Sequence, residues 1–238
     1  MRRERDRRAA RGASDPFAAL VATLSPKVWV DAHGGSFLSL SGSNVDSATD
    51  RSGNSLHPAQ TGSARPTYDA TAFSGRGGIL FAAASSQSLV SPSFSMGTRS
   101  SGSLVWRTTA DSMAALEFGT LNSHTLIFCQ SGNETVRRAS GGAGGGDMTK
   151  AVTAPVTMRV TWRVSPTSAR AIFDGAATTL GAGAAPPALT STLTLGAING
   201  GATFLLSGLI GEMIFADAEW SDVDMDTVDA AMAARWGL

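Results

Sequence analysis

The chain has a single cysteine, Cys129, among its 238 residues. That count excludes an internal disulfide and a cysteine metal cluster, so the hydrophobic core has to stabilise the fold. No apolar run approaches the roughly 18 residues that a membrane-spanning helix needs. The N-terminus also lacks the continuous apolar stretch of a secretory signal. We therefore expect a chain that folds in the cytoplasm of its maker and has no membrane partner.

Charged residues, tyrosine and histidine are also scarce. Charged residues make up 16% of the chain, and it has one tyrosine and three histidines. By contrast, glycine occurs 27 times and hydrophobic residues make up 42%. This composition is typical of many short strands joined by tight turns. A chain of this length forms either one large β-sandwich or two small domains.

A basic arm opens the chain and differs from the rest of it. Residues 1–12 hold six arginines against Glu4 and Asp6, a net charge of +4, and the body carries about −4 because the whole chain is neutral. The predicted anchoring residues are Arg2, Arg3, Arg5, Arg7, Arg8 and Arg11. A charged, apolar-poor segment stays disordered or becomes ordered against a partner. It is either an anchor on an acidic surface or a solvated tail, and nucleic acid is not the partner that we expect.

A short helix and a first strand follow the arm. Residues 16–24 can form a helical turn that ends before Pro26. In Lys27–Asp31 the two valines fall on one face of a strand and the tryptophan falls on the other. Between Ser36 and Thr67, serine, glycine, asparagine and aspartate are frequent, which predicts loops and turns.

The clearest strand covers Thr157–Val164. Its apolar residues, Met158, Val160, Trp162 and Val164, alternate with threonine and arginine, which predicts a half-buried strand. After a further run at Ser168–Asp174, the pair Asp174-Gly175 signals a hairpin. Similar strand-like runs occur at Gly78–Phe81, Ser103–Thr108, Met113–Phe118, Thr125–Cys129, Thr192–Leu195 and Leu209–Phe215.

The C-terminal segment breaks this pattern. Ser221 can cap a helix, and acidic residues in its first turn suit the positive end of the helix dipole. The apolar residues at helical spacing are Met225, Val228, Met232 and Trp236. Gly237 then ends the helix. We predict a helix over residues 221–236 that packs one stripe onto the sandwich.

Several fragments in order resemble the laminin-G-like, concanavalin A-type domains common in bacteriophage virion proteins and bacterial surface proteins. The fragments are LSPKVWVDA (24–32), DRSGN (50–54), ARPTY (64–68), GRGGILFAAASSQSLV (75–90) and the segment from Leu209 to the closing RWGL at 235–238. The family's Phe-Asp-Gly stands here as Phe81-Ala82-Ala83, and Ala48 replaces its usual tryptophan, so no ligand site is carried over.

Patterns and resemblance together predict an all-β fold. It is a two-sheet antiparallel jelly-roll sandwich of the concanavalin A-like kind, with one C-terminal helix and a basic N-terminal arm. The arm and its helical lead-in occupy residues 1–24, where they can act as an anchor, and the sandwich occupies residues 25–238.

Catalytic patterns are weak. Glucanases of this fold alternate carboxylates along one strand, and the nearest pair here, Glu212 and Asp217, would face opposite sides of a regular strand. The glycine run at 141–146 lacks the lysine of a phosphate loop and fits a hairpin tip. Neither a zinc site nor a Ser-His-Asp nucleophile is indicated by the three widely spaced histidines, His33, His57 and His124.

Calcium is the one metal that the early loops suggest. Oxygen ligands stand at Asp31, Asp46, Asp50 and Asn54, and related sandwiches often hold calcium in such loops. Their spacing matches no fixed cation loop, and the same residues cap turns without a metal. The calcium site and the metal-free turn therefore both stay open, and no other cofactor is expected.

The resemblance implies a non-enzymatic structural or surface-binding component of a phage-like particle, such as a capsid decoration, head fibre or tail protein. Such a protein is assembled in the host cytoplasm and resides in the virion. Its expected partners are other virion proteins, further copies of itself and a cell-surface glycan. The alternatives are a carbohydrate-binding lectin outside a virion and a glycan hydrolase. For a lectin, the tryptophans fall in strand patterns that indicate core positions.

Overall fold

The computed structural model describes residues 15–118, 125–138, 146–181, 186–198 and 203–238. The arm with its six predicted anchoring arginines lies outside the described residues. His124 and most of the predicted hairpin tip at 141–146 lie outside them as well. Within the described residues, no helix is long and apolar enough to cross a membrane.

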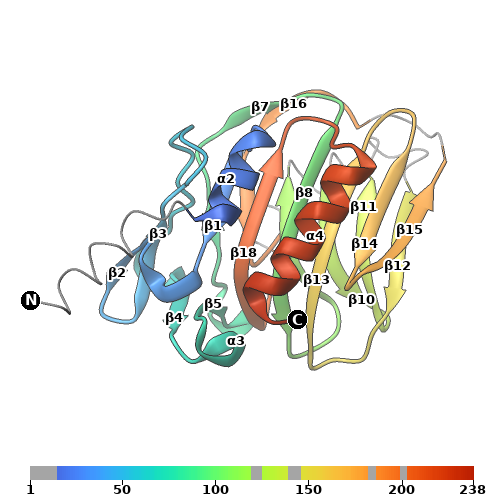
Figure 1. Cartoon of the computed structure of the whole chain (residues 1–238). Coiled ribbons are helices and arrows are strands. Elements are labelled where there is room, and N and C mark those ends of the chain that lie inside the picture. Colours follow the sequence, from blue (N-terminus) through green and yellow to red (C-terminus); the bar gives the residue numbers. More distant parts are fainter. Residues whose placement is uncertain (1–14, 119–124, 139–145, 182–185, 199–202) are drawn as a thin grey trace, which may run out of the picture.

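Two antiparallel sheets stack as a β-sandwich (Figure 1). In the described part of the chain, the larger sheet has ten strands, nine of which run in the order β15-β14-β13-β8-β18-β5-β4-β3-β2, while β1 also pairs with β18. The bounds are β1 Val28–Asp31, β2 Leu38–Ser41, β3 Asn44–Ala48, β4 Thr67–Asp69, β5 Gly78–Phe81, β8 Ser100–Thr108, β13 Val156–Val164, β14 Ala169–Phe173, β15 Ala176–Leu180 and β18 Gly208–Ala216.

The smaller sheet has six strands in the described residues, in the order β12-β11-β10-β9-β17-β6. They are β6 Leu89–Val90, β9 Met113–Phe118, β10 Thr125–Gln130, β11 Asn133–Arg138, β12 Gly146–Ala151 and β17 Leu193–Leu195, and a separate ribbon joins β7 Phe94–Met96 to β16 Leu189–Ser191. The predicted all-β, two-sheet antiparallel sandwich is confirmed. So is the hairpin at Asp174-Gly175, where both residues have positive φ between β14 and β15.

The main core fills the space between the sheets. All four apolar residues predicted for β13 are fully buried there. Phe118 of the smaller sheet stacks on Phe215 of the larger one with ring centroids 3.8 Å apart. Trp162 lies against Gly102, where a Cβ atom would come within 2.4 Å of the indole ring. Glycine is therefore required beside this tryptophan.

Helices cover the outer face of the larger sheet. α4 (Asp222–Trp236) crosses this face, and α2 (Pro16–Thr23) lies beside it (Figure 1). As predicted, Ser221 caps α4, in a capping box with Asp224, and Gly237 ends it at φ 67°. The four predicted apolar residues of α4 are buried in a second core with Trp29 of β1. The middle of the sheet, around β13 and β8, is consequently covered on both faces.

This covering corrects one prediction about β13. Its outer face was expected to meet solvent, but Arg159 is 5% exposed and forms two hydrogen bonds with Asp229 of α4, at 2.9 and 3.0 Å. The hydroxyl of Thr161 also donates to Asp229, at 3.2 Å. The polar residues of this alternation therefore hold a helix through a buried ion pair.

The stretch from Ser36 to Thr67 corrects another prediction. It was expected to hold loops and turns only, yet β2 and β3 form an antiparallel hairpin within it. β2 lies at the edge of the sheet and is mostly exposed, and its Leu-Ser-Leu-Ser alternation is only four residues long within a stretch rich in turn-forming residues. The short helical turns of the chain are η1 His33–Gly35, η2 Gly62–Ala64, α3 Ala72–Gly75 and η3 Ala83–Ser85.

Candidate functional site

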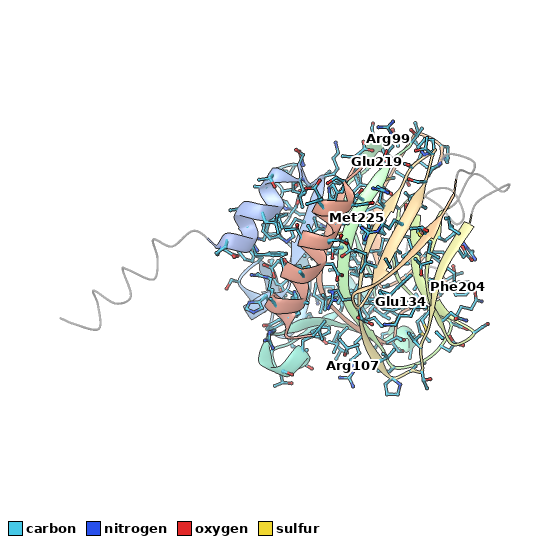
Figure 2. The ribbon with its side chains drawn as sticks, turned by 45° about the vertical axis from the view of Figure 1, so that its right-hand side comes forward. Arg99, Arg107, Glu134, Phe204, Glu219 and Met225 are labelled. Atoms are coloured by element: carbon cyan, nitrogen blue, oxygen red, sulfur yellow. The ribbon has the colours of Figure 1, made fainter. Side chains whose placement is uncertain are left out.

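A polar hollow of about 290 Å³ opens at the end of the sandwich where α3 meets the end of α4. Arg107, one of its lining residues, is labelled in Figure 2. Side chains from four strands and both helices line it. The lining residues are Asp69, Thr71, Ala72, Phe73, Ser74, Arg107, Thr157, Leu209, Trp236, Gly237 and Leu238. Segments far apart in the sequence therefore meet in one concave site.

The α3 turn shapes one wall of this hollow. Phe73 and Ser74 have φ values of 48° and 60°, a left-handed conformation that costs about 1 kcal/mol or more for each residue other than glycine. Phe73 packs edge-on against Trp236, with ring centroids 5.2 Å apart. Asp69 accepts hydrogen bonds from the hydroxyl and the backbone N–H of Thr71, at 2.6 and 2.8 Å, and these bonds lower the pKa of Asp69. The turn thus presents an ionised carboxylate.

The opposite wall depends on a glycine. Gly211 lies where the pairing of β18 with β8 shifts register. A Cβ atom at Gly211 would lie 2.9 Å from the indole of Trp236. The missing side chain lets the Trp236 indole approach the sheet closely, which brings the end of α4 to the hollow.

Arg107 is the lining residue of the hollow whose positive charge is not paired within the described part of the chain. It is exposed on β8, opposite Thr157 of β13 and Leu209 of β18. Among the arginine side chains that the structure describes, Arg107 alone has no hydrogen-bond or ion-pair partner. Its five N–H donors are available to a ligand in the hollow.

The hydrolase pair that we considered from the sequence does not form. Glu212 lies beneath α4 and accepts hydrogen bonds from Arg235 at 2.9 Å and from the indoles of Trp29 and Trp236 at 2.8 and 2.7 Å. Burial raises the pKa of Glu212 to about 7, against the opposing effect of Arg235. Asp217 lies beyond the end of β18 and accepts from the backbone of residue 97 at 2.7 Å. Glu212 therefore joins helix to sheet.

The calcium candidates do not converge on one site. Asp31 is fully buried and pairs with two arginines, and Asp46 pairs with Arg65 at 2.5 Å. Asp50 accepts three backbone N–H bonds and one hydroxyl bond. Asn54 donates its amide to two backbone carbonyls. Across the described residues, no three His, Cys, Asp or Glu side chains gather as a metal site. These side chains instead stabilise the early strands and turns through ion pairs and hydrogen bonds.

The aromatic residues behave mostly as the sequence indicates. No tryptophan is more than 4% exposed, so all five belong to the cores and none offers a flat exposed platform. His57 accepts a hydrogen bond from the backbone of Asp50 at 2.9 Å, while the ring of His33 lies edge-on to Trp236 at 5.6 Å.

No protein-family model matches the sequence, and no curated protein matches it. Solved structures share its fold. One of them is the receptor-binding domain of a botulinum neurotoxin mosaic of serotypes C and D, which is 10% identical to this chain and has a TM-score of 0.63. The alignment covers 89% of this chain and 52% of the neurotoxin chain. A structure of botulinum neurotoxin type C is also 10% identical, with a TM-score of 0.57, and its alignment covers 89% of this chain and 52% of the neurotoxin chain. The binding domain of Paraclostridial Mosquitocidal Protein 1 has a TM-score of 0.58 at 10% identity, covering 82% and 51%. The chain thus spans about half the length of these structures.

Proposed function

We propose that this protein is a non-catalytic carbohydrate-binding domain that holds a sugar ring in the hollow beside Arg107. The observation that carries the proposal is an arginine without a partner across a concave site that also presents the ionised Asp69. A planar guanidinium donates to neighbouring hydroxyls, and a carboxylate accepts from them.

The shape and lining of the hollow support this ligand class. Its volume of about 290 Å³ stands near the lower end of small-ligand sites, which suits one ring of a glycan rather than a large cofactor. Ser74 and Thr157 are among its lining residues, and their hydroxyls have no hydrogen bond within the described residues. Phe73 offers an aromatic surface for the C–H face of a sugar.

The similar structures support a binding role. Botulinum neurotoxin type C depends on interaction with two ganglioside molecules to reach the cell interior, and another similar structure is a botulinum neurotoxin binding domain in complex with SialylT. Those ligands belong to those proteins, and the low identity leaves the sugar bound here to experiment.

The lining also favours binding over hydrolysis. Glycoside hydrolysis uses a pair of carboxylates that flank the scissile bond. Among the side chains that line the hollow, Asp69 is the only carboxylate. The Asp31 and Glu212 pair on β1 and β18 is fully buried beneath α4, where substrate does not reach it.

Arg107→Met should weaken glycan binding by at least about tenfold, because it removes charge-assisted hydrogen bonds. The measurement is a glycan array with the wild-type chain, followed by titration of the best sugar against both proteins. Arg99→Met is the matched control, since Arg99 is exposed just before the start of β8, at the opposite end of that strand from Arg107, and makes only a 3.7 Å ion pair. The proposal would be wrong if the wild-type protein bound no glycan at high concentration. It would also be wrong if Arg107→Met and Arg99→Met bound the sugar with equal affinity.

We further propose that the domain belongs to a virion, to which the arm fixes it. The +4 arm against a body of about −4 supports this role, together with the resemblance to phage virion domains. Other virion proteins and further copies of the chain are then its partners.

Deleting residues 1–14 should leave the melting temperature of the body unchanged while the truncated chain no longer joins the particle. The physical reason is that an arginine-rich, apolar-poor segment is suited to electrostatic contacts with an acidic partner surface rather than to packing in a hydrophobic core. Co-sedimentation with assembled particles is the measurement, with the six arm arginines changed to glutamine as a second variant. Normal incorporation of both variants would exclude the anchor.

A further inference from the structure

A second hollow, of about 370 Å³, lies between the end of α2 and the start of β1. A turn that the sequence suggested for calcium forms part of its wall. The lining residues are Ala22, Ser25, Pro26, Lys27, Trp29, Arg51, Ser52 and Asn54.

Hydrogen bonds fix the backbone around this hollow. The Asn54 amide donates to the carbonyls of Pro26 and Lys27 at 3.1 and 3.0 Å, and the Ser52 hydroxyl donates to the carbonyl of Lys27 at 3.0 Å. The backbone N–H of Lys27 donates to the carbonyl of Phe215 at 2.6 Å. These bonds tie the turn to the strand, so the hollow is a preformed part of the fold.

The second hollow is lined by cations. Lys27 has no ion-pair or side-chain hydrogen-bond partner among the described residues. The Arg51 guanidinium lies 3.8 Å from the ring of Trp29 and 4.0 Å from that of Phe37, and one of its nitrogens pairs with Asp31. No acidic side chain lines the hollow. Two positive groups without a lining carboxylate attract an anion and repel a cation.

We infer that the second hollow binds an oxyanion, namely a sulfate, phosphate or carboxylate group. Lys27 supplies the mobile charge, and Arg51, held between two rings, supplies fixed N–H donors. Neither of the nearest calcium candidates adds a negative charge to the lining, because Asp50 is buried behind the wall, where it accepts four hydrogen bonds, and Asn54 is uncharged. The inference does not rest on the sugar site beside Arg107.

Lysine labelling of the full chain tests this inference directly. The sequence has only two lysines, Lys27 and Lys150, and Lys150 pairs with Asp174 at 2.5 Å elsewhere in the fold. Inorganic sulfate, inorganic phosphate and acetate are added separately, each against chloride at equal ionic strength, and acetylation of both lysines is followed by mass spectrometry. Sulfate or phosphate should slow the labelling of Lys27 several-fold and leave that of Lys150 unchanged. No protection of Lys27, or equal slowing of both lysines, would overturn the inference.

Variants of the two lysines give a second measurement. Sulfate should raise the melting temperature of the wild type and of Lys150→Met by more than that of Lys27→Met, because a ligand of the native state stabilises it. The general stabilising effect of sulfate is common to all three proteins and cancels in this comparison. Lys27→Arg should keep the larger rise. Equal rises in Lys27→Met and Lys150→Met would contradict the site, while Arg107→Met should behave as wild type, which separates this site from the proposed sugar site.

Discussion

Trp162→Asp should abolish the native fold. Trp162 is fully buried between the two sheets, and its ring fills the space that Gly102 leaves open. Truncating a buried tryptophan alone costs about 3–5 kcal/mol. An unpaired carboxylate at the same place adds several kcal/mol more, because the position has no partner to solvate the charge. The sum reaches the whole stability of an ordinary domain, which is about 5–15 kcal/mol.

Circular dichroism and thermal unfolding measure this effect against two controls. Trp162→Phe should fold, and it loses little hydrogen bonding because the indole N–H of Trp162 has no partner. Thr179→Asp, on the exposed edge strand β15, places the same charge in solvent and should change the melting temperature little. A Trp162→Asp protein that melts with the wild type would show that this side chain does not lie in the core.

Residues with strict local periodicity made the fold predictable from the sequence. The alternation around Trp162 identified the inner face of β13, and the helical spacing from Met225 to Trp236 identified the buried stripe of α4. The role of the other face of β13 could not be predicted. Whether Arg159 meets water or Asp229, 70 residues later in the chain, depends on where the C-terminal helix comes to lie, and no local pattern encodes that position.

Neither hollow could be predicted from spacing. Asp69, Arg107 and Trp236 stand far apart in the chain and share no common motif, so only the fold brings them together. The aspartates of the early loops were recognised as functional candidates by residue type alone. Their hydrogen bonds depend on partners such as Arg65, whose proximity follows from the hairpin that the sequence did not reveal.

A second large effect concerns Glu134, which lies on β11 and is fully buried (Figure 2). The indole of Trp106, from the opposite sheet, donates to one of its carboxyl oxygens at 2.9 Å, and the other oxygen has no partner within the described residues. Burial raises the pKa of Glu134 from 4.5 to about 8, although the hydrogen bond from Trp106 opposes the rise. At neutral pH this carboxyl group therefore keeps its proton in the native state.

A pKa raised by folding means that the native state holds a proton that the unfolded state releases. The free energy of unfolding should therefore fall as pH rises from about 4.5 to about 8, by about 1.4 kcal/mol per pH unit at most. Below that window both states are protonated, and above it both are ionised. Glu212, whose pKa is raised to about 7, contributes in the same direction, so a comparison with a variant that lacks only the Glu134 carboxyl group separates the two contributions.

Glu134→Gln should flatten the stability curve between pH 7 and 8 and make the variant more stable than the wild type at pH 8, by roughly 4 kcal/mol before any loss from the unpaired amide. Urea unfolding at a series of pH values measures both effects. Glu219→Gln serves as the control, because Glu219 lies at the surface with ion pairs of 3.7 and 3.8 Å and should leave the slope unchanged. If the wild type and Glu134→Gln lose stability in parallel up to pH 8, the group that binds the proton is another one. Since the Trp106 hydrogen bond joins the two sheets, ionising Glu134 acts on the centre of the sandwich, and that is why a single carboxyl group has so large an effect on its stability.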